Sequence, residues 1–322
     1  MSEIKTKVDD STIDNFFKSH DQASPESLQE IGHGEISQAY FFEEQGTTKV
    51  LRINQHTDNG FKKDQFAYEY FSGPNIPIPK IEEIGELSEG LYYAVSEKSP
   101  GKTLVTMSQE EYTQIVPALI QTLDDIHHLQ PAGEGFGSIQ TDGSAPYTTW
   151  KDFLKHHRPE SDSLEKLKSI DFFDADLIQA GWDTAEQMHQ YLPDNVRQVI
   201  HSDYGFDNAL GEGDKITGII DWNDCKYGDP LVDVARLDLW QSMYKPAWQI
   251  NFAELFKQRY IEQGRLPEHF NERILCYKII SCVGTMAFFA EANLSDKYAT
   301  NKKILQNLLT QANQHISDDA SS

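Results

Sequence analysis

Residues 199–208 read Val-Ile-His-Ser-Asp-Tyr-Gly-Phe-Asp-Asn, and residues 218–222 read Gly-Ile-Ile-Asp-Trp, with a Gly-rich turn between them at 211–214. The segments on either side of the turn at 211–214 are strand-like, so the pattern predicts two strands joined as a hairpin. The far ends of a hairpin lie side by side, and we therefore expect Asn208 and Asp221 to be neighbours. Two such oxygen ligands could bind one Mg²⁺ ion.

Asp203 precedes Asn208 by five positions, which is the spacing of the protein-kinase catalytic loop. In that loop the Asp orients the acceptor hydroxyl and the Asn holds Mg²⁺. We predict that Asp203 is the catalytic residue of a phosphoryl transfer and that Asn208 and Asp221 are its metal ligands. The alternative for Asp203 is a carboxylate that only caps a turn. His201 is expected to pack beneath the loop and satisfy backbone groups.

Gly228-Asp229-Pro230 follows as a turn that leads into a helix. Asp233 lies early in that helix, where its carboxylate could accept N–H groups from the catalytic loop. We interpret both acids as supporting structure.

The first 98 residues alternate short strand-like runs with turn residues, and they contain one helical segment. This pattern predicts a five-stranded antiparallel sheet that carries one helix, the arrangement of a kinase nucleotide lobe. The expected strands are Ser27–Ile31, Gln38–Glu43, Thr48–Asn54, Lys80–Leu87 and Leu91–Glu97, and the expected helix is Lys62–Ser72.

From Ser108 onward helical spacing dominates, beginning with a capping box made by Ser108 and Glu111. We therefore predict an α+β, bilobal protein-kinase-like fold, with a nucleotide-binding lobe over residues 1–98 and a helical lobe over 99–322 that holds the catalytic hairpin and the substrate site. The expected helices after the first run to Leu129 lie near Thr149–His157, Asp174–Tyr191, Leu231–Met243, Asn251–Gln263, Asn271–Asn293 and Asp296–Ile316.

A loop with two glycines, Gly32 and Gly34, connects the first two expected strands and ends at Ser37. Exposed backbone N–H groups in such a loop can approach a nucleotide phosphate. Two glycines alone are a weak signal, and the alternative is a tight hairpin without a ligand.

Arg52 is flanked by apolar positions on the third expected strand, as a side chain that points from a central strand into a cleft would be. Kinases usually place Lys here and pair it with a helix Glu, whereas the matching acid in this chain is Asp64. The longer guanidinium compensates for the shorter carboxylate. Lys49 and Glu69 are poorer candidates by position. The alternative interpretation is an ordinary surface ion pair.

The chain has 28 basic and 51 acidic residues among 322, which gives a formal net charge of −23. This charge repels nucleic acid and anionic membranes, and it attracts a small cationic substrate. The alternative is that acidity only maintains solubility or reflects adaptation to salt. Asp224, Asp238 and Glu291 are candidate substrate contacts, although solvated helix faces carry such acids routinely.

Three scattered cysteines form no Cys-x-x-Cys pair, and the N-terminus lacks the apolar core of a signal peptide. These features favour the cytoplasm. The most apolar stretch, Cys276–Ala290, contains Lys278 and is shorter than a membrane span, so we expect a buried helix. We expect a monomer or weak dimer.

The segments His-Ser-Asp-Tyr-Gly-Phe-Asp-Asn, Ile-Asp-Trp and Gly-Asp-Pro-x-x-Asp resemble the motifs of aminoglycoside phosphotransferases, and the likeness is closest to the hygromycin B phosphotransferases. The resemblance covers roughly residues 30–240. Stretches that match in order are 34–41, Val50–Asn54, Phe61–Asp64, Ile76–Pro79, Ile84–Glu89, Tyr147–Phe153 and Ile216–Trp222.

The resemblance implies an ATP- and Mg²⁺-dependent enzyme that phosphorylates a hydroxyl of an aminocyclitol antibiotic and so confers resistance, with GTP an open alternative as donor. It further implies that Arg52 contacts phosphate and that Glu97, in the hinge, contacts adenine through its backbone. Two positions depart from the family: Ser202 stands where Gly is common, and the helix acid is Asp64 rather than Glu.

Two other functions compete with antibiotic phosphorylation. The first is a metabolic kinase for a sugar, choline-like or amino-alcohol substrate, because one fold hosts many acceptors. The second is a silent binding protein that keeps the architecture without transferring phosphate. The presence of Asp203, Asn208 and Asp221 together argues against silence.

Overall fold

The structure is a computed structural model that describes residues 5–32, 36–55, 57–158, 161–248 and 250–319. The chain divides into two compact units. The first consists of Met1–Ala132, Ile139–Ser144 and Tyr204–Cys225, and the second of Gly133–Ser138, Ala145–Asp203 and Lys226–Ser322. The sequence analysis placed a boundary after residue 98, between a nucleotide-binding lobe and a lobe with the substrate site. This division by function stays a prediction.

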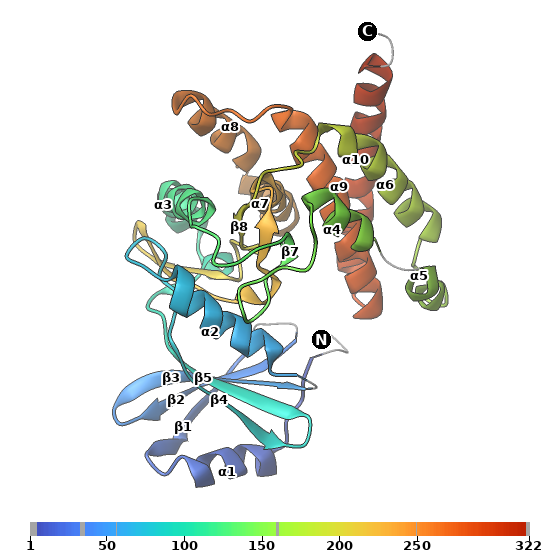
Figure 1. The fold of residues 1–322 in the computed structure, drawn as a ribbon. Helices are drawn as coiled ribbons and strands as arrows, with labels where there is room; N and C mark the ends of the chain where they lie inside the picture. Colours follow the sequence, from blue (N-terminus) through green and yellow to red (C-terminus); the bar gives the residue numbers. More distant parts are fainter. Residues whose placement is uncertain (1–4, 33–35, 56, 159–160, 249, 320–322) are drawn as a thin grey trace. The chain divides into compact units, whose positions relative to one another are not determined.

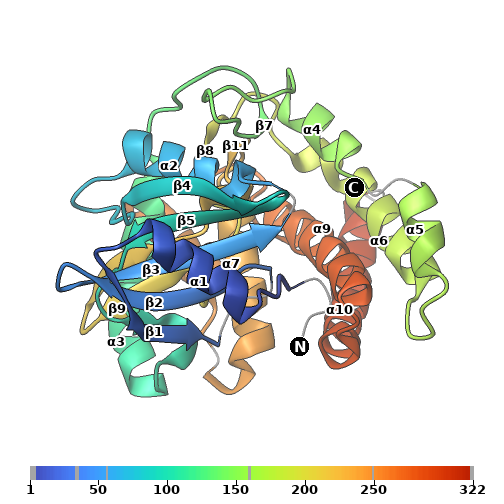
Figure 2. The same ribbon diagram turned by 90° about the horizontal axis from the view of Figure 1, so that it is seen from below.

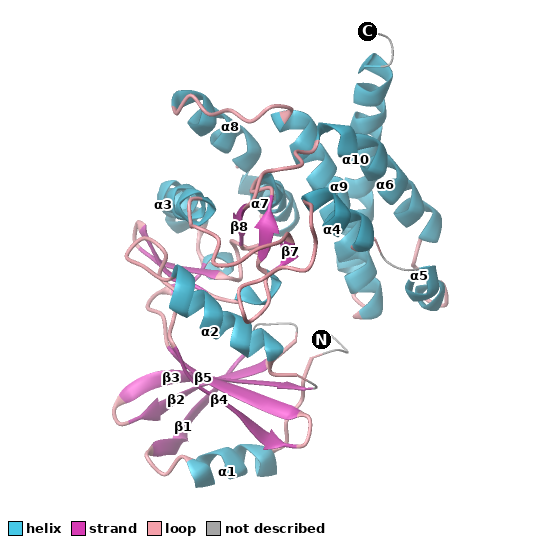
Figure 3. Ribbon diagram, in the orientation of Figure 1, coloured by secondary structure: helices cyan, strands magenta, loops and turns pink. Residues whose placement is uncertain are grey.

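The first unit is built on a five-stranded antiparallel sheet in the order β1-β2-β3-β5-β4 (Figures 1 and 3). Each strand lies where the sequence predicts one, with its ends displaced by a few residues at most. The predicted fold class is therefore confirmed. The strands are β1 (Ala23–Ile31), β2 (Gln38–Glu44), β3 (Thr47–Gln55), β4 (Ile81–Ser88) and β5 (Leu91–Glu97).

Two helices cover opposite faces of this sheet. The predicted helix is α2 (Asn59–Phe71), and it packs Phe61 against the face that carries Ala94. The sequence analysis missed the other helix, α1 (Asp10–Ser19), which lies across the second face (Figure 2). Its apolar stripe, which includes Phe16, packs on Leu51 of β3. A helix of 10 residues depends on such packing for its stability.

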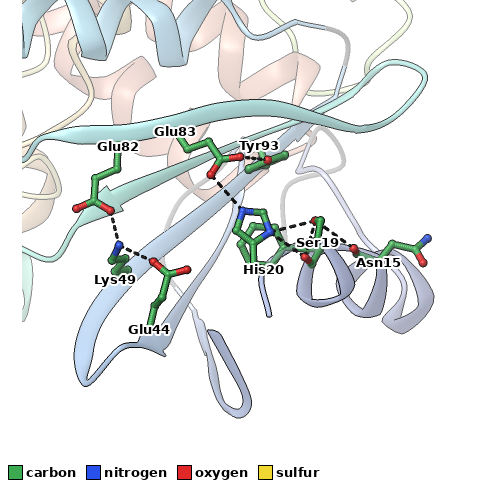
Figure 4. Close-up of polar contacts among 9 residues, drawn as sticks. Asn15, Ser19, His20, Glu44, Lys49, Glu82, Glu83 and Tyr93 are labelled. Carbon is green, nitrogen blue, oxygen red and sulfur yellow. Dashed lines mark hydrogen bonds and ion pairs between the residues drawn. The ribbon is translucent and has the colours of Figure 1, made fainter. Parts of the chain in front are cut away.

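Lys49 lies on the α1 face of β3, as the strand alternation predicts, and pairs with Glu44 at 2.6 Å and with Glu82 (Figure 4). Burial lowers the pKa of its ammonium group, but the hydrogen bonds to the two carboxylates outweigh burial and raise the pKa overall. Lys49 is therefore held by carboxylates of β2 and β4, and its side chain lies on the opposite face of β3 from that of Arg52.

The C-terminal end of α1 is fixed to the sheet by the ring of His20 (Figure 4). This ring stacks on Phe16 with centroids 4.0 Å apart, and its Nε2 lies 3.2 Å from a carboxylate oxygen of Glu83. Glu83 also accepts a hydrogen bond from the hydroxyl of Tyr93. Burial, together with this carboxylate, raises the pKa of Tyr93, so the phenol stays protonated and donates.

The remainder of the first unit continues through the predicted capped helix and the predicted hairpin. The capping box of Ser108 and Glu111 is present in both directions at the start of the helix. A short strand pairs with the hairpin to form a three-stranded sheet in the order β10-β9-β6. The elements are β6 (Lys102–Thr103), η1 (Leu104–Thr106), α3 (Gln109–His127), β9 (Ala209–Glu212), β10 (Lys215–Ile219) and η3 (Trp222–Asp224).

The second unit is mainly helical, with one small sheet in the order β7-β11-β8. Every long helix expected here is present, whereas α5 and the three short strands were missed because each is too short to show a period. The elements are β7 (Gly137–Ser138), α4 (Trp150–His156), α5 (Ser161–Leu167), α6 (Ala175–Met188), η2 (His189–Tyr191), β8 (Gln198–Ile200), β11 (Lys226–Gly228), α7 (Leu231–Tyr244), η4 (Pro246–Trp248), α8 (Phe252–Glu262), α9 (Phe270–Glu291) and α10 (Ser295–Asp319).

Helix α9 is the central helix of the second unit and packs against α6, α7 and α10 (Figure 1). By length and composition alone it could cross a membrane, but 56% of its most apolar window is buried inside the structure. Side chains such as Ile279 and Val283 are fully buried. Core helices of globular proteins share this composition, and α9 is the buried helix that the sequence predicts.

Glu111 provides a test of the helix cap. Hydrogen bonds from Lys102 and from Ser108 hold the pKa of the Glu111 carboxyl at about 2. A group with a lowered folded-state pKa stabilises the protein above its unfolded-state pKa, and this contribution is lost as pH falls through the folded value. We therefore expect Glu111→Gln to reduce stability at pH 7, with the difference from wild type shrinking from about pH 4.5 towards pH 2.

Urea unfolding of both proteins across this pH range measures the difference. Glu110→Gln, one residue earlier in the same turn, is the control and should show a smaller effect at every pH. A gap between wild type and Glu111→Gln that stays constant down to pH 2 would contradict the assigned role.

Candidate active site

The hairpin of β9 and β10 brings the two predicted metal ligands together within the first unit. Ala209 pairs with Ile219, and the N–H of Ile220 donates to the carbonyl of Asn208 at 2.9 Å. Asp221 follows directly, so both side chains leave the same end of the hairpin. The predicted neighbourhood of Asn208 and Asp221 is confirmed, while their role as metal ligands stays a prediction.

Asp221 has a left-handed backbone conformation, with φ 62° and ψ 66°, which is strained for a residue other than glycine. The next residue, Trp222, is fully buried and anchors the turn. Its indole N–H donates to the carbonyl of Ile219 at 3.2 Å, and its ring packs near Phe71 of α2. The buried indole thus holds the backbone so that the Asp221 side chain stays exposed.

The Asp64 carboxylate connects Arg52 of β3 to this turn. One oxygen, Oδ2, lies 2.7 Å from Nη2 of Arg52, and the other, Oδ1, accepts the backbone N–H of Trp222 at 2.7 Å. The Asp64 side chain is 7% exposed, and that of Arg52 is 22% exposed. The predicted ion pair is confirmed, and it is partly buried rather than an ordinary surface pair. Sequence reasoning missed the second bond, to the residue beside Asp221.

The guanidinium of Arg52 is further positioned by Phe61, whose ring centroid lies 5.2 Å from its central carbon. On the same helix, Nζ of Lys63 donates to the carbonyl of Asn223 at 2.9 Å. Helix α2 therefore contacts the turn after Asp221 through Lys63, Asp64 and Phe71. It contacts Arg52 of β3 through Phe61 and Asp64.

In the second unit, Asp203 follows a rigid backbone segment. His201 and Ser202 donate their N–H groups to the two oxygens of Asp233, at 3.0 and 2.7 Å. The N–H of Asp203 donates to Nδ1 of His201 at 3.2 Å, and the His201 ring is fully buried. Both predicted supporting roles are confirmed. The Asp203 side chain itself is 41% exposed, as a group that meets a substrate needs to be.

Ser202 has a positive φ of 72°, which explains why glycine is common at this position in the resembling family. Its hydroxyl oxygen accepts a hydrogen bond from Nζ of Lys226 at 3.0 Å, and both residues are buried. The serine hydroxyl therefore gives a buried cation a hydrogen-bond acceptor, while its positive φ costs backbone strain. No sequence signal in a single chain connects these two positions.

Asp229 anchors the following turn and is fully buried. Arg273 of α9 binds it in bidentate fashion at 2.9 and 2.6 Å, and the hydroxyl of Tyr277 donates to it at 2.7 Å. Trp150 in turn donates its indole N–H to Tyr277 at 2.9 Å. A side chain at Gly228 would meet the Trp150 ring at 2.3 Å, so this position requires glycine. Asp229 is structural, as predicted.

The remaining predicted nucleotide contacts lie at the ends of strands in the first unit. Gly32 is exposed after β1 and Ser37 is half-buried before β2, whereas Gly34 lies outside the described residues. Glu97 ends β5, and its N–H donates to the carbonyl of Lys80 at 3.0 Å. An adenine contact from the Glu97 backbone would therefore use its carbonyl oxygen.

The three acids proposed as substrate contacts differ in their surroundings. Asp238 binds Nζ of Lys278 at 2.5 Å and the N–H of Ala253 at 3.1 Å, so it has a structural use that sequence reasoning missed. Asp224 is exposed in η3, and Glu291 is exposed at the last residue of α9. Contact of any of the three with a substrate stays a prediction.

The donor set of the hairpin fits a hard divalent cation. An amide and a carboxylate supply only oxygen ligands, and Mg²⁺ is typically bound by one or two such groups together with water and substrate phosphates. Arg52 adds a fixed guanidinium in the same unit, a group that binds phosphate oxygens well. The residue types of the hairpin and Arg52 therefore fit a metal-bound phosphate chain, and this role stays a prediction.

Replacement of Asp64 tests its two-sided contact. Asp64→Ala leaves the buried N–H of Trp222 and the Arg52 guanidinium without this acceptor, and we expect a loss of about 2–4 kcal/mol in unfolding free energy. Asp64→Asn keeps an oxygen for the Trp222 N–H and should cost about half as much. Chemical denaturation measures both. Asp58→Ala, which removes an exposed pair with Lys62 on the same helix, is the control and should cost below about 1 kcal/mol. Equal losses for all three variants would refute the two-sided contact.

Substitutions at Ser202 test the strained backbone. Ser202→Ala keeps the positive φ and removes the Lys226 acceptor, whereas Ser202→Gly removes both the acceptor and the strain. We expect the glycine variant to be the more stable of the two by about 1 kcal/mol in urea unfolding. The order should reverse at Ser242, an exposed helical position in α7, where glycine costs about 1 kcal/mol relative to alanine. If the alanine variant were the more stable of the two at Ser202, as it is expected to be at Ser242, the φ of Ser202 would not be strained.

Comparisons with known proteins identify relatives of this chain. The sequence is 31% identical to the hygromycin-B 4-O-kinase of Escherichia coli over 221 residues, which are 68% of this chain and 63% of that protein. A solved structure of a thermostable mutant of aminoglycoside phosphotransferase APH(4)-Ia superposes with a TM-score of 0.79 at 25% identity, covering 92% of this chain and 98% of that one.

A second structure of a thermostable APH(4)-Ia mutant, in ternary complex with AMP-PNP and hygromycin B, has a TM-score of 0.78 at 25% identity and covers 92% of this chain and 96% of that one. The family described as the phosphotransferase enzyme family matches residues 27–270, a span that contains Arg52, Asp64 and the whole hairpin. The chain therefore belongs to the phosphotransferase enzyme family.

Proposed function

We propose that this protein transfers the γ-phosphate of ATP to a hydroxyl of an aminocyclitol antibiotic such as hygromycin B and thereby confers resistance. The observation that carries the proposal is the 31% identity to a hygromycin-B 4-O-kinase. The chain spans 63% of the length of that relative, so its activity is inferred from the aligned part and from the site residues. The complex of APH(4)-Ia with AMP-PNP and hygromycin B supports both the nucleotide and the acceptor.

In the proposed reaction, the acceptor hydroxyl oxygen forms a bond to the γ-phosphorus while the bond from that phosphorus to the bridging oxygen of ADP breaks. The hydroxyl proton passes to the carboxylate of Asp203, whose backbone is fixed by Asp233. Charge develops mainly on the phosphate oxygens, where Arg52 is held by Asp64 to meet it. Asn208 and Asp221 would hold Mg²⁺, which neutralises phosphate charge when bound.

The charge of the chain supports a cationic acceptor. A formal net charge of −23 favours the approach of an aminated sugar through the summed field. The same field opposes an anionic nucleotide, so the donor needs Mg²⁺ and fixed local cations. A cationic antibiotic and a metal-bound nucleotide together satisfy both requirements.

A cytoplasmic location is part of the proposal. The three cysteines, Cys225, Cys276 and Cys282, are buried and form no disulfide with one another. Burial raises the pKa of the Cys282 thiol to about 12 and also raises that of Cys276, so both stay protonated. Thiols of this kind suit a reducing compartment.

Mass spectrometry after incubation with Mg-ATP tests the proposal. The acceptor panel contains hygromycin B, other aminoglycosides, sugars, choline and amino alcohols, and we expect a phosphate mass gain on hygromycin B. Asp203→Asn should lower kcat by about 100-fold or more. Asp214→Asn, in the exposed hairpin turn, is the control and should match wild type.

Each other outcome points to a different function. Phosphorylation confined to a sugar, choline or an amino alcohol would replace the proposal with a metabolic kinase. Binding of Mg-ATP without transfer to any acceptor would identify a silent binding protein. Expression in a sensitive bacterium should raise the tolerated hygromycin B concentration, and the Asp203→Asn protein should not.

A further inference from the structure

One face of helix α7 lies against the segment that carries Asp203. Asp233, Arg236 and Trp240 are spaced i, i+3 and i+7, so they share a stripe along the helix. Asp233 accepts the N–H groups of His201 and Ser202, which fixes that stripe against the backbone just before Asp203. Arg236, one turn further along α7, is thereby directed at the side chain of Asp203.

The contact of Arg236 with Asp203 is close but loose. Its Nη2 lies 3.6 Å from Oδ1 of Asp203, an ion-pair distance that exceeds a direct hydrogen bond. The Arg236 side chain is 22% exposed, and its guanidinium lies over the ring of Trp240, with 5.4 Å between its central carbon and the ring centroid. The ring supports the cation from one side and limits the directions in which it can move.

The Nε–H of Arg236 is buried and has no hydrogen-bond partner among the residues that the structure describes. A buried donor without a partner costs about 1–3 kcal/mol, so a residue kept only for packing would be more favourable as an apolar side chain. The arginine thus carries a local stability cost that an apolar side chain at this position would avoid. Such a cost is typical of functional sites, where local rules of stability are broken.

We propose that Arg236 is a positioning residue for Asp203, holding one carboxylate oxygen so that the other is oriented towards the acceptor hydroxyl. The inference rests on the proposed phosphotransferase function. Catalytic contacts often tighten when substrate binds, and a separation of 3.6 Å is short enough for such a change to give a direct hydrogen bond. The role requires a cation at this place and does not require a contact with either substrate.

The test compares three variants of the full-length protein. Arg236→Met keeps the apolar stem without charge, Arg236→Lys keeps the charge, and Arg158→Met removes a surface arginine that pairs with Asp183 and Glu186. For Arg236→Met we expect kcat to fall about 10- to 100-fold, with KM for ATP and for the acceptor within about twofold of wild type. Arg236→Lys should recover most of kcat, and Arg158→Met should not change it.

The direction of the change in Tm distinguishes a positioning role of Arg236 from a packing role. Arg236→Met removes the unpartnered donor, so its Tm should equal or exceed that of wild type while kcat falls. A drop in Tm, a loss carried by KM of either substrate, a change in kcat below about threefold, or equal losses for Met and Lys would each overturn the inference. The first of these outcomes would make Arg236 structural, and the second would make it a substrate contact.

A crystal structure of each variant gives a readout that does not depend on turnover. The Asp203 carboxylate should keep its wild-type rotamer in Arg236→Lys and should be rotated or doubly populated in Arg236→Met. An unchanged carboxylate in Arg236→Met would overturn the inference even if no acceptor in the panel is phosphorylated. Absence of turnover by the wild type counts against the proposed function alone, so the two failures are distinguishable.

Discussion

The Asp64 carboxylate is the constraint on which the first unit depends. Its two oxygens are divided between the guanidinium of Arg52 and the backbone N–H of Trp222. Because the side chain is nearly buried, neither contact can be replaced by water without cost. The strand cation and the turn that carries Asp221 are therefore fixed relative to one another by a single group. A shorter acid serves here because arginine supplies the reach that the carboxylate lacks.

In both units, burial separates the acids that hold the backbone from the acids that are exposed to solvent. Asp64, Asp229 and Asp233 are buried, and each carboxylate accepts backbone N–H groups, with Asp64 and Asp229 also paired to arginines. Asp203 is 41% exposed, and Asp221 is exposed as well. The first group holds backbone in place, and the second group is presented by that backbone. The rigidity of the exposed acids is therefore a property of the buried ones.

The sequence predicts the sheet, the hairpin and the long helices because each has a local period or a turn signal that survives in a single chain. It predicts the Arg52 pair because strand alternation and helix spacing define one acid within reach. It does not predict the Trp222 contact of Asp64, the Lys226 contact of Ser202 or the placement of Arg236. These join positions that are distant in sequence or that have no periodic signature. Helix α1 was overlooked although its sequence carries a signal: Ile13, Phe16 and Phe17 share one face, and Asp9 caps the N-terminus.

A phosphotransferase with a net charge of −23 must offset the repulsion of anionic phosphate near its site. Screening by salt determines which charges can do so. At physiological salt, charges more than about 8 Å apart in solvent interact weakly, so distant acids influence approach more than binding. Cations in direct contact with the motif decide the local field. Among the described residues, the cations beside these segments are held by protein contacts: Arg52 by Asp64 and Phe61, Lys63 by the Asn223 carbonyl, Lys226 by Ser202, and Arg236 by the ring of Trp240. A cation fixed in this way loses little conformational freedom when it binds an anion, so a partly exposed one such as Arg52 can act against a large excess of surface acids.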